Sequence, residues 1–249
     1  MPRLIFDIET VGVEFDSLDE KSQETLLRFA ETPEEVEAVK EGLGFSPLTG
    51  EVVAIGILNP DTDKGAVYFN SQGEHENEVP ILSPSEKQNR GSSISQPNQS
   101  HLGEIGKDAQ YIPCADEKEI LKNFWDVVSH YDQFVTFNGR TFDCPYILVR
   151  SAIHKIKPTK NLMPNRYYDE HIDLLDRLTF FGAVRRKGNL HMWCQAFGIE
   201  SPKSKGVTGD DVAQLFRDQK AFDIAKYCFG DLKATKTLYD YWAKYINIK

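Results

Sequence analysis

Cysteine is scarce in this chain, and its placement excludes the common cysteine-based scaffolds. The 249 residues include only four cysteines, far apart at Cys114, Cys144, Cys194 and Cys228. Because there is no CxxC pair, neither a zinc ribbon nor a disulfide framework is predicted. A cytoplasmic protein with reduced thiols is therefore the expectation.

Long apolar segments are also missing. No run approaches the roughly 20 apolar residues that a membrane-spanning helix needs, and no basic stretch followed by an apolar one marks a secretory signal at the N-terminus. With 40% apolar and 11% aromatic residues, the chain has ample material for a packed core. Its length suits one large α/β domain or two small ones.

Basic residues are fewer than acidic ones, and the formal net charge is −9. Taken alone, this negative charge argues against a nucleic-acid partner. The distribution of charge changes this interpretation. Residues 14–41 hold ten acidic and three basic side chains, whereas residues 140–206 hold twelve basic and six acidic ones. The acidity is thus concentrated near the N-terminus and the middle of the chain is basic. Taken alone, both segments are more simply explained as ordinary solvated faces.

Three strands are expected at the start of the chain. The segments 3–9, 51–59 and 65–70 are rich in β-branched and aromatic residues, and "PDTDKG" forms a turn between the last two. Three successive strands indicate an antiparallel meander.

An acidic helical insertion is expected between the first two strands, at about 14–45. In "TPEEVEAVKEG", Thr32 is a suitable N-cap, Pro33 occupies the first helical position and Glu35 completes a capping box. Gly42 ends this helix.

Residues 71–108 are rich in Ser, Gln, Asn, Gly and Pro and poor in aromatic residues. This composition indicates an exposed and mobile loop rather than a domain boundary. The whole chain, 1–249, is therefore interpreted as a single domain.

Helices and strands alternate after this loop. An amphipathic helix is predicted at 116–131, with Asp116 and Glu119 at its start. Its expected buried stripe consists of Ile120, Phe124, Val127 and Tyr131, and a strand follows at 133–139. Further predicted elements are a helix at 144–155, a short strand at 171–173 and helices near 174–181, 189–197, 208–218 and 221–245. The order β-β-β-α-β-α-β-α predicts an α/β fold with a mixed sheet flanked by helices.

Three segments of the chain carry acidic residues that are candidates for a functional site. Asp7 and Glu9 are two residues apart in a buried strand and so point to the same face. Such a pair repels itself and is costly to desolvate. Asp143 stands where a helix begins, and Tyr227 and Asp231 share one face of the last helix. Each feature alone has a plain structural explanation, such as an N-cap for Asp143.

Together, Asp7-x-Glu9, Asn138-x3-Phe142-Asp143 and Tyr227-x3-Asp231 resemble the three ordered motifs of the DEDD 3′–5′ exonucleases. The tyrosine before the last aspartate is similar to the tyrosine branch (DEDDy), which includes the proofreading domains of family-B DNA polymerases. The chain resembles most the stand-alone polymerase-B-like 3′–5′ exonucleases. "SPKSKGVTGDDV" and "YCFGDLKATKTLYDYW" are also similar to that group.

This resemblance implies a ribonuclease H-like fold and a two-metal hydrolase. Asp7, Glu9, Asp143 and Asp231 would hold two divalent cations, and an oxygen-only set of ligands suits Mg²⁺ or Mn²⁺ rather than zinc. By analogy Asp7 bridges both metals, Glu9 and Asp231 hold the metal that carries the attacking water, and Asp143 supports the second. Tyr227 would orient that water, because a phenol with a pKa near 10 is a poor base at neutral pH.

Substrate contacts are expected at four positions. Thr10 follows the metal strand directly, a position the family often uses near the 3′-terminal nucleotide. Asn138 either binds substrate or braces the turn into Asp143, and Phe142 either packs in the core or lies beside the terminal base, the core being favoured. Lys203, with Lys205, is a plausible phosphate contact. His191, next to apolar neighbours in "NLHMWCQAFGI", is assigned to packing, and Asp173 to capping the following helix.

The expected reaction removes nucleoside 5′-monophosphates from the 3′ end of single-stranded DNA. Two alternatives stay open. An RNA or oligonucleotide exonuclease of the same superfamily is one, although many of those have histidine in place of Tyr227. A catalytically silent nucleic-acid-binding module is the other, and the four intact carboxylates speak against it.

Overall fold

The computed structural model describes residues 1–71, 109–201 and 209–248. Its centre is a mixed six-stranded sheet with the order β4-β3-β2-β1-β5-β6. The strands are β1 (Arg3–Gly12), β2 (Gly50–Leu58), β3 (Gly65–Asn70), β4 (Ala109–Cys114), β5 (Gln133–Thr136) and β6 (His171–Asp173). Strands β1, β2 and β3 form the predicted antiparallel meander, whereas β4, β5 and β6 pair in parallel with their neighbours.

Strand β4 was not predicted from the sequence. It lies at the edge of the sheet beside β3 and is only partly buried. Its "AQYIPC" contains Pro113, which cannot donate a ladder hydrogen bond and is tolerated only at such an edge. This strand thus lacks an unbroken run of β-branched and aromatic residues, the feature from which the first three strands were predicted.

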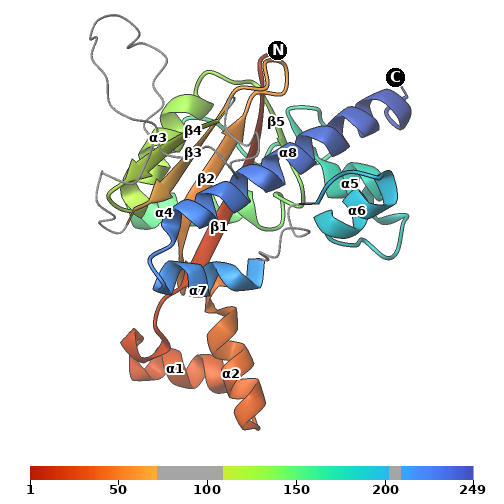
Figure 1. Cartoon of the computed structure of the whole chain (residues 1–249). Helices are drawn as coiled ribbons and strands as arrows, with labels where there is room; N and C mark the ends of the chain where they lie inside the picture. The colour runs from red at the N-terminus through yellow and green to blue at the C-terminus, as the bar shows by residue number, and fades with distance from the viewer. Residues whose placement is uncertain (72–108, 202–208, 249) are drawn as a thin grey trace, which may run out of the picture.

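Helices cover both faces of the sheet (Figure 1). Leu4, Phe6 and Ile8 of β1 face α3 (Glu117–Val128) and α4 (Asp143–Ile153) on one side. Ile5 and Val11 face the other side, where the long helix α8 (Ala221–Tyr245) crosses the sheet. The smaller helices α5 (Leu174–Leu178), α6 (Leu190–Phe197) and α7 (Val212–Arg217) lie around α8.

The insertion after β1 is helical, as predicted. It contains α1 (Glu20–Leu27) and α2 (Pro33–Glu41), and it extends away from the sheet (Figure 1). Thr32 and Glu35 form the predicted capping box, and Gly42 is the C-cap of α2. Neither helix buries a residue.

A buried carboxylate joins α3 to the rest of the fold. Glu117 is 4% exposed and accepts hydrogen bonds from the backbone N–H of Val52 at 2.8 Å and from Arg150 Nε at 2.8 Å. His154 Nε2 lies 2.6 Å from the same side chain. Since Val52 belongs to β2 and Arg150 to α4, this network ties three elements together. Burial acts to raise the pKa of Glu117, but the hydrogen bonds from Arg150 and Val52 have the larger combined effect, so the pKa is lowered.

Glu117→Gln is expected to destabilise the protein by about 3–5 kcal/mol at pH 7, because it leaves a half-buried Arg150 without its counter-ion. A carboxylate with a lowered pKa stabilises the fold above its unfolded-state value, and this contribution is lost as the pH falls. The gap between the variant and the wild type should therefore shrink as the pH is lowered through 4.5. Chemical denaturation across this pH range, with Glu37→Gln on the exposed face of α2 as the control, measures it. An equal and pH-independent loss in both variants would contradict the role given to Glu117.

Candidate active site

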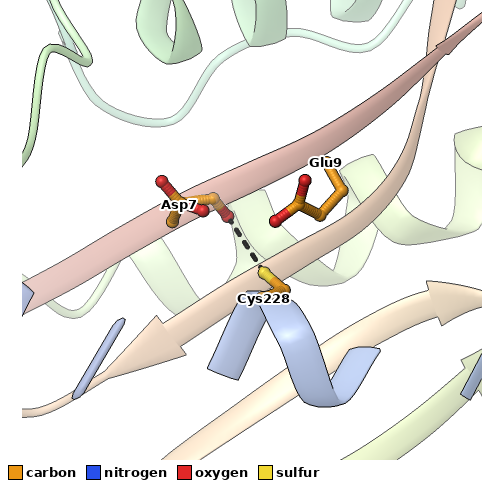
Figure 2. A group of neighbouring side chains, drawn as sticks. All are labelled: Asp7, Glu9 and Cys228. Carbon is orange, nitrogen blue, oxygen red and sulfur yellow. Dashed lines mark hydrogen bonds between the residues drawn. The ribbon is translucent and has the colours of Figure 1, made fainter. Parts of the chain in front are cut away.

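Two carboxylates of β1 point toward α8. Asp7 and Glu9 share the face of Ile5 and Val11, as the period of two requires. Glu9 is only 7% exposed. Figure 2 shows the two side chains next to each other on β1, with Cys228 of α8 facing them. Carboxylate oxygens of Asp7 and Glu9 and the Cys228 sulfur all lie within 4.8 Å of one another.

A glycine on the neighbouring strand lets α8 approach this closely. Gly56 of β2 pairs with Asp7, and a Cβ at position 56 would lie 2.6 Å from Leu232 Cδ1 and 2.9 Å from Cys228 Sγ. Any side chain at this position would push α8 away from the sheet. Gly56 thus helps to place Tyr227 and Asp231, one helical turn apart on α8, over the carboxylates of β1.

Asp143 reaches the same place from the start of α4. Strand β5 pairs with β1 only over Arg3–Ile5, so the backbone N–H of Ile8 lies beyond this ladder. That N–H donates to Asp143 Oδ1 at 3.1 Å. The purely structural alternative for Asp143, an N-cap, does not apply, because Phe142 is the N-cap residue of α4 and Asp143 is its first helical residue. The Asp143 carboxylate is tied to β1 beside Asp7.

These side chains surround a pocket of about 370 Å³. Asp7, Asp143, Tyr227 and Asp231 line it, and Glu9 lies beside Asp7 just outside the lining. The other lining residues are Ile8, Phe137, Asn138, Phe142, Leu175, Gly188, Asn189, Leu190, His191 and Ser201. The structure thus brings together all five residues for which the sequence predicted a catalytic role.

The pocket brings several acidic side chains close together. Burial raises the pKa of Asp7 well above its ordinary value, and the charges of Asp143, Asp231 and Glu9 raise it further. Burial raises the pKa of Asp143 to about 7, with Asp173 and Asp231 contributing. The described residues place no lysine or arginine in the lining of the pocket. A bound cation would reduce the repulsion among these carboxylates and so stabilise the arrangement.

The chemistry of the donors fits divalent cations of the hard type. The side chains that could ligate are carboxylates, which suit Mg²⁺ or Mn²⁺. The Cys228 thiol also lies close to the carboxylates, but its Sγ–H donates to the backbone carbonyl of Asp7 at 3.8 Å (Figure 2). Burial, with the charges of Glu9 and Asp7, raises the pKa of this thiol well above 9. Cys228 is therefore a packing residue, and the oxygen ligands define the site.

Tyr227 presents a neutral hydroxyl to the pocket. Burial raises its pKa far above 10, and the charges of Asp231, Glu9 and Asp7 act in the same direction, as does a hydrogen bond to Asp231. A phenol in this environment stays protonated at neutral pH. It can donate or accept a hydrogen bond, but it cannot serve as a general base.

Only some of the residues predicted to contact substrate line the pocket. The hydroxyl of Thr10 donates to the carbonyl of Gly44 at 2.8 Å, so it fastens the insertion to β1 and does not line the pocket. Phe142 lines the pocket and also packs, half-buried, against Tyr146 and the core. Lys203 and Lys205 lie outside the described residues, as do residues 72–108 of the predicted loop at 71–108.

Asn138 lies at the pocket and also braces the turn into Asp143. It lines the pocket, and its Oδ1 accepts a hydrogen bond of 2.6 Å from the hydroxyl of Thr141. Its backbone is in the left-handed region with φ of 65°, and Asp173 holds it there by accepting its N–H at 3.0 Å. Asp173 also caps α5, as predicted, by accepting the N–H of Leu175. The turn before Asp143 is thereby fixed.

His191 was assigned to packing, and this assignment is wrong. The side chain lines the pocket, and its Nδ1 is hydrogen-bonded to the hydroxyl oxygen of Ser201 at 2.8 Å. Ser201 is 1% exposed and also lines the pocket. The apolar neighbours of His191 in the sequence suggested a core position, but Leu190 and His191 both begin α6 at the rim of the pocket. Nothing in the local sequence distinguishes such a rim from a core.

A comparison with models of protein families identifies the class. A family model described as predicted 3′–5′ exonucleases related to the exonuclease domain of PolB matches residues 92–246. The chain belongs to this family, as the resemblance in its motifs predicted. The matched span contains Asp143, Tyr227 and Asp231, while Asp7 and Glu9 precede it. A search of curated proteins found no match.

The fold is similar to that of a solved structure, the family B DNA polymerase from the hyperthermophilic archaeon Pyrobaculum calidifontis. The TM-score is 0.55 at 14% sequence identity, and the alignment covers 97% of this chain and 24% of the polymerase. This chain therefore spans about a quarter of the length of that polymerase. The predicted ribonuclease H-like α/β fold is confirmed. None of the helices in the described part has the length and hydrophobicity needed to cross a bilayer.

Proposed function

We propose that the chain is a metal-dependent exonuclease that hydrolyses the 3′-terminal phosphodiester of single-stranded DNA and releases nucleoside 5′-monophosphates. In this proposal residues 1–249 act as one exonuclease domain. The observation that carries it is the convergence of Asp7, Asp143, Tyr227 and Asp231 on one pocket, with Glu9 next to Asp7. Membership in the family supports the polarity of the reaction.

Four carboxylates would hold two divalent cations, Mg²⁺ or Mn²⁺. Asp7 would be a ligand of both, Glu9 and Asp231 would bind one, and Asp143 would bind the other. A bound pair of this kind activates a water on one side of the phosphodiester and stabilises the leaving oxygen on the other.

The protein's own side chains position the reactants. The Tyr227 hydroxyl lies with Asp231 at the pocket, where it can hydrogen-bond to the attacking water. Because the phenol stays protonated, its contribution is orientation and not proton abstraction. Phe142 and Asn138 line the same pocket and are available to the terminal nucleotide, Phe142 by its ring and Asn138 by its amide. Lys203 is proposed as a phosphate contact on the strength of its sequence position alone.

Degradation of labelled substrates tests this proposal. A 5′-labelled single-stranded DNA should give a ladder that shortens from the 3′ end in Mg²⁺ or Mn²⁺ and should stay intact in EDTA. Duplex DNA and RNA of the same sequence should be cut more slowly. Faster cutting of RNA would move the assignment to an RNA exonuclease, and binding without cutting of any strand would favour a silent binding module.

A further inference from the structure

Three consecutive cations border the pocket. Arg185, Arg186 and Lys187 are exposed and directly precede Gly188 and Asn189, which line the pocket. An extended chain spans at most about 3.6 Å per residue, so even Arg185 has its Cα within about 11 Å of that of Gly188. The segment lies between α5 and α6, on the side of the fold where α8 passes (Figure 1).

Several of the other cations in the basic part of the chain are already paired with acidic side chains. Arg150 pairs with Glu117, Lys160 with Asp132, Arg166 with Asp176 and Arg177 with Asp169. By contrast, Arg185, Arg186 and Lys187 form no ion pair within the parts of the chain that the structure describes. Their charge therefore faces solvent at the mouth of a strongly negative pocket.

The backbone of this segment is held in place although its side chains are exposed. The indole Nε1–H of Trp193 donates to the carbonyl of Lys187 at 2.6 Å. Asn189 caps α6 by accepting the N–H of Met192 at 3.0 Å. The three cations thus project from a backbone that is fixed to the pocket wall.

We propose that Arg185, Arg186 and Lys187 bind the phosphates of the nucleotides that precede the scissile bond in a single strand. The inference rests on the proposed function, because it takes the 3′ end to lie at the carboxylates. A strand that leaves this end must cross the rim of the pocket, and an anionic backbone is attracted to cations that have no partner of their own. The pocket accommodates the reacting nucleotide, and the Arg185–Lys187 segment provides affinity for the rest of the strand without reading its sequence.

The test compares long and short substrates. Arg185→Gln/Arg186→Gln/Lys187→Gln should raise KM for dT12 about tenfold or more, while kcat and the KM for pTpT change less than about twofold. Loss of three phosphate contacts should also reduce the slope of log Kd against log[salt] by about 2, measured by anisotropy of 5′-fluorescein-dT12 in EDTA. Arg185→Lys/Arg186→Lys, which keeps the charge, should retain most of the affinity for dT12.

A matched control removes the same charge elsewhere. Lys118 and Lys122 on α3 and Lys157 beyond the end of α4 are exposed, and these helices cover the opposite face of the sheet. Lys118→Gln/Lys122→Gln/Lys157→Gln should bind dT12 almost as well as the wild type. An equal loss in both triple variants would show only a general charge effect and would overturn the proposal.

Failure of this inference and failure of the proposed function give different results. If the wild-type protein cuts no oligonucleotide of any length, the proposed function is wrong. A different result is that the wild type cuts both lengths and the 185–187 variant keeps the wild-type preference for dT12 and the wild-type salt slope. The exonuclease function is then supported, and the proposal that the Arg185–Lys187 segment binds phosphates is wrong. The thermal transition of the variant, measured by circular dichroism, should match that of the wild type because all three side chains are exposed.

Discussion

Asp7→Ala is expected to abolish hydrolysis while single-stranded DNA still binds. Asp7 is the carboxylate proposed to contact both cations, so its loss should remove the charge stabilisation of both the attacking and the leaving oxygen. A fall of about 10⁴-fold or more in kcat, which corresponds to about 5.5 kcal/mol in the barrier, is the predicted result. Single-turnover cleavage of a labelled oligonucleotide in saturating Mn²⁺ measures it, with anisotropy as the measure of binding.

Asp7→Ala should abolish activity but increase the stability of the metal-free protein. In the absence of metal, Asp7 is repelled by Asp143, Asp231 and Glu9, so its removal relieves like-charge repulsion. Tm in EDTA should rise, by about 2–4 °C for each kcal/mol relieved, and the further rise that Mn²⁺ causes in the wild type should disappear. Asp16→Ala, an exposed change on the insertion, is the control. Activity of Asp7→Ala within tenfold of the wild type would rule out the proposed ligand set.

Tyr227→Phe and Asp231→Asn are expected to separate positioning from metal binding. Tyr227→Phe removes one hydroxyl and keeps the ring, so the loss of an orienting hydrogen bond should slow turnover by roughly 10- to 1000-fold. The Mn²⁺ concentration needed for half-maximal rate should barely change, because a neutral phenol is not a ligand. Asp231→Asn removes a charge from the ligand set and should both slow turnover and raise that concentration.

A Mn²⁺ titration of single-turnover rates distinguishes the two. Tyr146→Phe is a suitable control, because its hydroxyl bonds to the carbonyl of Gly44 and not to the pocket. If Tyr227→Phe shifts the Mn²⁺ midpoint as far as Asp231→Asn does, Tyr227 maintains the structure of the metal site and does not position water.

The sequence predicted most elements of the fold because their signals are local. The capping box at Thr32 and Glu35 and the three apolar strands of the meander are examples. Strand β4 has no such signal, since its pairing with β3 depends on a partner distant in the sequence, and Pro113 argues against a strand. The buried stripe of α3 was also predicted only in part. Ile120 and Phe124 are buried as expected, whereas Val127 and Tyr131 are only partly so and Leu121 and Trp125 take their place.

The five catalytic candidates could be named from motifs, but what assembles them could not. The close approach of α8 depends on the missing side chain of Gly56, and the position of Asp143 depends on an N–H that β5 leaves without a ladder partner. Both features depend on contacts between elements that are far apart in the sequence. For the same reason Ser201 was not singled out and His191 was assigned to packing, because their hydrogen bond joins the start of α6 to a residue ten positions later.

Anomalous diffraction at the manganese edge, from crystals grown with Mn²⁺ and the product dTMP, tests the central claim most directly. The account predicts two peaks about 3.5–4 Å apart, both within coordination distance of Asp7, with Glu9 and Asp231 on one and Asp143 on the other. The phosphate of dTMP should lie against both peaks, near the Tyr227 hydroxyl. Manganese bound elsewhere in the chain, with none at Asp7, would contradict it.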